Sequence, residues 1–114
     1  MVYKKENMTT SVRSNLKGGE GDISFINFAD CTDFKNCRLL SQMTIPVGGS
    51  IGEHTHINES EYYIISEGNG MAVDNGVEKA VEKGDLVVTA HGESHKLVNT
   101  GDIPMKVIAI IITY

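Results

Sequence analysis

Three histidines and one glutamate, drawn from two distant segments, constrain the fold of this chain most strongly. His54 and His56 are two residues apart, and residues two apart on a β-strand point to the same face, roughly 6 to 7 Å from each other. Their imidazoles can therefore converge on one point. Glu61 follows five positions after His56, and His95 lies much later in the chain. These four side chains can meet only if the two segments fold into one cage.

The strand that contains His56 must be interrupted before Glu61 if both side chains are to face the same side. Five positions is an odd step, so one unbroken strand would point the two side chains to opposite faces. The intervening residues 57–60 are mostly polar and include Asn and Ser, which favour turns. We therefore expect a turn or bulge before Glu61. Glu59 has the same strand parity as Glu61 and competes with it as the carboxylate of the site.

Short β-rich runs recur along the chain and predict an all-β fold. They are rich in β-branched and aromatic residues and are separated by turn-forming residues. The runs cover residues 23–28, 38–45, 61–66, 71–73, 86–89, 95–98 and 105–113. Asn75-Gly76 predicts a tight hairpin, because both residues tolerate positive φ. No segment shows a convincing amphipathic helical pattern.

The spacing of the glycines and the candidate ligands resembles two motifs of the cupin superfamily. The first motif is matched in order by Gly48, His54, His56, Glu61 and Gly68. The second is matched by Gly84, Gly92, His95 and Asn99, with Ala90 at the position of the usual proline. The resemblance covers roughly residues 38 to 113. It implies a double-stranded β-helix, the jelly-roll barrel of cupins.

The resemblance also implies a metal site. Its ligands would be His54, His56, Glu61 and His95. Three imidazoles and one carboxylate suit one divalent manganese, iron, cobalt, nickel, copper or zinc ion, whereas calcium and magnesium prefer oxygen ligands. An octahedral arrangement leaves two adjacent positions open, which favours manganese or iron. Strand alternation from Glu61 and His95 places Tyr63, Leu97 and Asn99 on the metal-facing side, where we expect them to line a pocket for a small ligand.

Among cupins, a compact single-domain chain with this ligand set looks like the proteins described as oxalate decarboxylase-like. The resemblance implies a metal-dependent decarboxylase or dioxygenase acting on a small carboxylate or oxygenated metabolite. Oxalate decarboxylases have two cupin domains and an arginine three residues before the first histidine, where this chain has Ile51, so oxalate itself is disfavoured. The alternatives are a non-catalytic cupin that binds or sequesters a small molecule, and a metal-dependent isomerase or lyase. The candidate acids and bases are Glu53, His91 and Glu93.

Composition limits the domain organisation and the partners. A chain of 114 residues with 40% hydrophobic residues suits one domain. We assign residues 22–114 to the barrel and residues 1–21 to an N-terminal arm that is either frayed or exchanged with a partner subunit. A net charge of -5 argues against nucleic acid, and no apolar run is long enough to span a bilayer. Without a signal-peptide pattern, we expect a cytoplasmic protein in which Cys31 and Cys37 are reduced.

The C-terminal run predicts a homodimer. Residues 107–112 are apolar at both strand parities, so both faces of this strand require burial. One face can fill the barrel, and the other can meet a second subunit. Tyr62 and Ile64 would point outward in the same way if Glu61 points inward.

Overall fold

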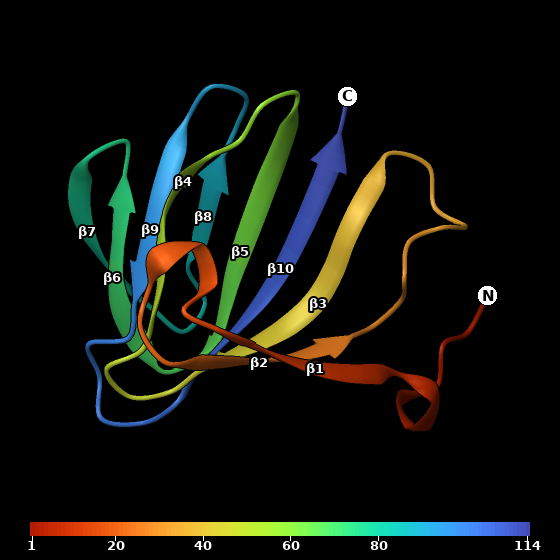
Figure 1. Cartoon of the computed structure of the whole chain (residues 1–114), viewed down its shortest axis with the longest axis horizontal. Helices are drawn as coiled ribbons and strands as arrows, with labels where there is room; N and C mark the ends of the chain where they lie inside the picture. Colours follow the sequence, from red (N-terminus) through yellow and green to blue (C-terminus); the bar gives the residue numbers. More distant parts are fainter.

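The computed structural model describes residues 1–114, which form two antiparallel β-sheets packed face to face (Figure 1). One sheet has six strands in the order β1-β2-β3-β10-β5-β8, and the other has four in the order β4-β9-β6-β7. The strands are β1 (Thr9–Ser14), β2 (Asp22–Asn27), β3 (Cys37–Ile45), β4 (Ser50–Thr55), β5 (Glu59–Glu67), β6 (Asn69–Asp74), β7 (Val77–Glu82), β8 (Leu86–Thr89), β9 (Ser94–Val98) and β10 (Met105–Thr113). The predicted all-β jelly roll is confirmed.

The helical content is limited to two short 3-10 turns, η1 (Lys5–Asn7) and η2 (Leu16–Gly18). The structure contains no helix with the length and apolar character that a membrane crossing requires. The predicted hairpin is present between β6 and β7, where Asn75 and Gly76 both have positive φ, at 49° and 83°. This pair of conformations matches the twist of the two strands that it joins.

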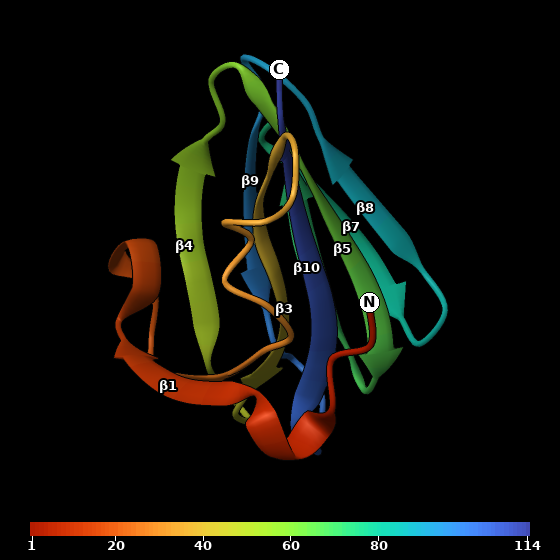
Figure 2. The ribbon, with the colours of Figure 1, turned by 90° about the vertical axis from the view of Figure 1, so that its right-hand side faces the viewer.

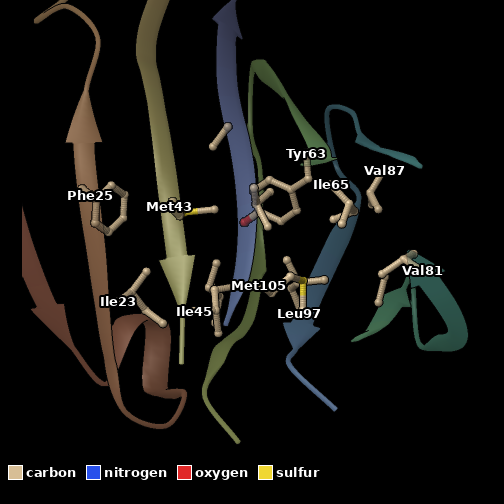
Figure 3. Packing of buried hydrophobic residues seen from close by; sticks show 14 residues of the cluster. Ile23, Phe25, Met43, Ile45, Tyr63, Ile65, Val81, Val87, Leu97 and Met105 are labelled. Carbon is tan, nitrogen blue, oxygen red and sulfur yellow. The ribbon is translucent and has the colours of Figure 1, made fainter. Parts of the chain in front are cut away.

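The core lies between the two sheets and is built from every second residue of the inner strands. Along β10 the buried side chains alternate with partly exposed ones, as expected for a strand with one face in the core. Figure 3 shows side chains from both sheets meeting there, among them Met43 of β3, Ile65 of β5 and Leu97 of β9. Each fully buried side chain of this size contributes about 1.5–3 kcal/mol to folding.

The N-terminal segment packs against its own chain. β1 pairs with β2 along its whole length, and the turn that follows it, orange-red in Figure 2, lies beside β4. The backbone nitrogen of Ser50 donates a hydrogen bond to the carbonyl oxygen of Glu20 at 2.9 Å. A Cβ atom at Gly19 would collide with the Ser50 carbonyl, and one at Gly52 would collide with the Lys17 carbonyl. The segment therefore covers the free edge of β4, while its exchange with a partner stays a prediction.

Of the two cysteines, Cys31 lies in the loop between β2 and β3, and Cys37 is the first residue of β3. Both are free thiols, and their Sγ atoms lie 3.6 Å apart. Burial raises the pKa of the Cys31 thiol to about 11, and the neighbouring Cys37 adds to this shift. The Cys31 thiolate is therefore scarce near neutral pH.

Candidate metal centre

A β-bulge in β4 positions the first histidine. Ile51 pairs with Leu97 and His54 pairs with His95, so β4 has two residues where β9 has one. The extra residue reverses the parity of the strand, and both Ile51 and His54 face the interior although they are three positions apart. β4 ends at Thr55, and the left-handed Asn58 then turns the chain into β5. The predicted interruption before Glu61 is thus a turn around Asn58.

The four predicted ligands converge on one point. The Nε2 atom of His95 lies 3.0 Å from Nε2 of His54 and 3.1 Å from Nε2 of His56. Oε1 of Glu61 lies 3.1 Å from Nε2 of both His56 and His95, and 3.8 Å from that of His54. The candidate donor atoms all lie within 4.8 Å of one another, so this cluster can hold one metal ion.

The Nδ1 atoms of the three rings contact other groups, which leaves the Nε2 atoms for the centre. Nδ1 of His54 lies 2.8 Å from the carbonyl oxygen of Gly52, which can only accept a hydrogen bond, so Nδ1 carries the proton. Nδ1 of His56 lies 2.6 Å from a carboxylate oxygen of Glu59, and Nδ1 of His95 lies 2.7 Å from the hydroxyl of Thr89. Partners of this kind fix the tautomer and the ring orientation of metal-binding histidines. The donor set therefore fits a transition metal.

Glu59, the alternative carboxylate, lies behind His56 and pairs with Arg38. The guanidinium of Arg38 donates two hydrogen bonds of 2.8 Å to the carboxylate of Glu59. Between β3 and β10 the register shifts at Arg38, so that Leu39 and Cys37 have partners and Arg38 has none. Such a bulge redirects a side chain, here toward Glu59. Arg38, and to a smaller extent His56, lower the pKa of Glu59 to about 2.

The charge states within the cluster follow from its burial and its mutual contacts. Burial raises the pKa of Glu61, but hydrogen bonds from the three imidazoles outweigh burial and hold this pKa below its usual range. The hydrogen bond with Glu61 raises the pKa of His56, whereas burial lowers the pKa of His95. Glu61 therefore stays ionised, and a metal must compete with a proton mainly at His56.

A small cavity of about 170 Å³ adjoins the cluster. It is lined by Arg13, Leu16, Lys17, Phe25, Arg38, Leu39, Met43, Ile51, His54, Glu61, Tyr63 and Ile111. The ring of Tyr63 stacks on His95 with centroids 4.7 Å apart and planes inclined by 10°. Burial and the neighbouring Glu61 carboxylate raise the pKa of Tyr63 well above its ordinary value. The cavity is thus bordered by two of the candidate ligands and by a protonated phenol.

Two of the three predicted pocket residues lie elsewhere. Tyr63 lines the cavity, but Leu97 is fully buried in the core and Asn99 is not among the lining residues. The side-chain amide of Asn99 donates hydrogen bonds to the carbonyl oxygens of Ile45 and Ile103, at 3.0 and 2.9 Å. Asn99 therefore ties the end of β3 to the loop that precedes β10.

The candidate acids and bases also lie outside the lining of this cavity. Glu53 is exposed on β4. Nδ1 of His91 accepts a hydrogen bond from the backbone of Asn58, and the carboxylate of Glu93 accepts one from the side chain of Asn75. The cations that do line it, Arg13, Lys17 and Arg38, were not predicted, because two of them come from the N-terminal segment and the third is redirected by a bulge.

Residues 41–111 match the cupin domain family. The chain belongs to the cupin family. This cupin is 35% identical over 113 residues to the oxalate-binding protein of Thermotoga maritima, covering 98% of this chain and 93% of that one. It superposes with a TM-score of 0.92 on the crystal structure of a predicted oxalate decarboxylase from Thermotoga maritima, at 34% identity and over 100% of both chains. A sugar phosphate isomerase from Silicibacter pomeroyi shares the fold, with a TM-score of 0.80 at 16% identity over 100% of this cupin and 76% of that chain.

Proposed function

We propose that this cupin binds one divalent transition metal through His54, His56, Glu61 and His95, and that a small carboxylate binds to this metal. The convergence of the four donor atoms beside a cavity supports the proposal most directly. Manganese or iron suits the site best, because four protein ligands leave adjacent octahedral positions for an incoming ligand. When bound, such an ion supplies a Lewis acid that polarises a carboxylate oxygen.

The residues around the metal would orient the ligand and keep water out. His54 and Glu61 open onto the cavity, so a small molecule in it reaches the metal directly. Apolar side chains such as Met43 and Ile111 form much of the remaining wall. Tyr63 remains protonated because its pKa is raised, so its phenol contributes no negative charge to the wall.

The size of the cavity fits a small ligand. Its volume of about 170 Å³ accommodates an acid of two to four carbons. The isomerase alternative has less support, because the sugar phosphate isomerase shares only the fold, at 16% identity.

Binding without turnover is the first form of the proposal. The Thermotoga relative is named an oxalate-binding protein, and Glu53, His91 and Glu93 do not line the cavity. In the second form of the proposal, the protein is a decarboxylase or dioxygenase. A carboxylate that reaches the metal from the cavity, on the side of His54 and Glu61, would be polarised by the metal and could then react.

One experiment tests both forms. The metal-stripped protein is reloaded with Mn²⁺ or Fe²⁺, and oxalate, malonate and glycolate are titrated into it by calorimetry. Each mixture is then incubated with and without oxygen and assayed for carbon dioxide, formate and peroxide. Metal-dependent binding without products supports the first form, and metal-dependent products support the second. Equal binding to stripped and reloaded protein, or no binding of any of these acids, overturns the proposal.

A further inference from the structure

Two cations that line the cavity have no acidic partner. The ion pairs that Lys and Arg side chains make are Arg38–Glu59, Lys79–Asp74 and Lys106–Glu67. Arg13 and Lys17 are absent from these pairs, yet both line the cavity that holds His54 and Glu61. Both also lie outside residues 41–111, the part of the chain that matches the cupin domain family.

The pairing of β1 with β2 directs Arg13 toward the interior. Arg13 pairs with Ile23, and side chains directly opposite each other in an antiparallel pair lie on the same face. Ile23 is fully buried in the core, so Arg13 lies on the inward face of the edge strand. Its guanidinium carbon lies 4.7 Å from the ring centroid of Phe25, which also lines the cavity, while Arg13 as a whole remains exposed.

The turn η2 holds Lys17 on the same side. Lys17 has a positive φ of 56°, which is uncommon for a residue with a side chain. The close approach between the Lys17 carbonyl and Gly52 keeps this turn against β4, two residues before His54. The backbone of Lys17 is therefore held at the wall of the cavity by packing, and its side chain is exposed and forms no salt bridge.

The charges around the cavity do not balance. Its lining contains three cations, Arg13, Lys17 and Arg38, and one carboxylate, Glu61. Glu59 neutralises the charge of Arg38. A divalent metal bound at the cluster would more than neutralise the single negative charge of Glu61. The charges of Arg13 and Lys17 remain, in a chain whose net charge is -5. A cavity with local positive charge in an acidic protein favours an anionic ligand.

We infer that Arg13 and Lys17 recognise a second negative group on the ligand, so that this site selects small dicarboxylates over monocarboxylates. The inference rests on the proposed function, in which the metal binds the ligand's first carboxylate. Guanidinium and ammonium groups donate charge-assisted hydrogen bonds to carboxylate oxygens.

The test compares a dianion with a monoanion of similar size. Oxalate and glycolate can both chelate a metal, but only oxalate carries two negative charges. Their dissociation constants are measured by calorimetry for Mn²⁺-loaded wild type, Arg13→Gln and Lys17→Gln. Lys35→Gln is the matched control, because Lys35 is exposed, makes no ion pair and does not line the cavity. Metal content and melting temperature are recorded for every protein.

We expect Arg13→Gln and Lys17→Gln each to weaken oxalate binding about tenfold, with little change for glycolate and none for Lys35→Gln. Arg13→Lys should restore part of the loss, since it keeps the charge, and this variant also serves if Arg13→Gln folds poorly. Unchanged oxalate affinity in both Gln variants, or an equal loss for glycolate, overturns the inference and leaves the proposed function intact. A metal-loaded wild type that binds neither acid overturns the proposed function itself.

Discussion

His56 is held from both sides, by the cluster at Nε2 and by Glu59 at Nδ1. We predict that His56→Ala lowers the bound metal to less than about a tenth of the wild-type content, because it removes one of four donors. The barrel should stay folded, since the core does not depend on this ring. Metal content by plasma mass spectrometry and far-ultraviolet circular dichroism check the two parts.

His91→Ala is the matched control for this substitution. His91 is exposed, and its ring contacts the backbone of Asn58 rather than the cluster. It should retain wild-type metal content. Full metal occupancy in His56→Ala would contradict the ligand assignment.

Glu59 acts on the metal through His56, so it is a positioning residue. We predict that Glu59→Gln lowers metal affinity about 10- to 100-fold, the usual cost of losing the partner of a ligating histidine. A competition titration with a chromophoric chelator measures this loss. Glu78→Gln, on the exposed face of β7, should leave the affinity unchanged. An unchanged affinity in Glu59→Gln would show that the Glu59 contact does not orient the ring.

Glu59 also predicts a pH dependence of stability in the metal-free protein. Its pKa is about 2 in the folded chain and 4.5 ordinarily, so folding favours its ionised form. This contribution is fully present above about pH 4.5 and is lost as the pH falls toward 2. The free energy of unfolding, from denaturant titrations, should therefore fall more steeply in this window for the wild type than for Glu59→Gln. Parallel curves would contradict the shift.

The sequence predicts the four residues that converge at the cluster, because they lie on the fixed spacings of two motifs, but it does not predict their supporting contacts. Gly52 contacts His54 within the bulge of β4, and Thr89 contacts His95 across the β8–β9 turn, so neither contact follows from the motif spacing. Strand parity alone leaves Glu59 and Glu61 as competitors. In the structure Glu59 contacts Nδ1 of His56, whereas Glu61 lies at the Nε2 atoms. Asn99 is buried as its parity predicts, but its side chain bonds to backbone carbonyls at the end of β3 and in the loop before β10.

Among the elements, the contact between η2 and β4 determines the wall of the cavity. A Cβ atom at Gly52 would collide with the backbone of Lys17, which cannot move without displacing the whole turn. We predict that Gly52→Ala destabilises the fold by about 2–3 kcal/mol and weakens oxalate binding. Thermal unfolding and calorimetry measure the two effects.

Gly76→Ala is the control for Gly52→Ala. Unlike Gly52, Gly76 has a positive φ, nothing lies near the position of its added Cβ, and it belongs to the β6–β7 hairpin. It should cost about 1–2 kcal/mol in strain alone and leave oxalate affinity unchanged. Loss of binding in both variants would show that the effect of Gly52→Ala is not specific to η2.

Most strands could be predicted from the sequence because they bury apolar residues at alternate positions. All seven predicted runs correspond to strands of the structure, from β2 to β10, but β1, β4 and β7 are not among them. The residues of β1 and β7 are mostly exposed, so no alternation of apolar and polar residues marks these two strands. Their positions follow from pairing with β2 and β6, and such pairing is not a local property. In β4 the bulge interrupts the alternation, so only the spacing of the histidines pointed to a strand there.

For the molecule as a whole, the outer face of the six-stranded sheet carries an apolar row across β10, β5 and β8. Ile108 lies beside Ile64, and Ile64 beside Leu86, along one cross-strand row. Ile64 and Leu86 are 37% and 58% exposed. Contiguous apolar faces of this kind mark interaction surfaces, and the occupant that we predict is a second copy of the chain.

We predict that the protein is a homodimer and that Ile64→Lys converts it into a monomer, because the substitution places a charge in the contact. Sedimentation velocity at micromolar concentration measures both states. Val77→Lys, at an exposed position of β7 in the other sheet, should remain dimeric. A monomeric wild type would contradict the prediction.

The bulge between Ile51 and His54 lets β4 carry one residue more than β9 without turning the imidazole outward. If a related chain lacked one residue at Gly52 or Glu53, the pairing of β4 with β9 would become regular, and the histidine, then two positions after Ile51, would still face the interior. A relative with a one-residue gap in this strand could therefore keep the metal ligand, although its spacing would depart from the motif.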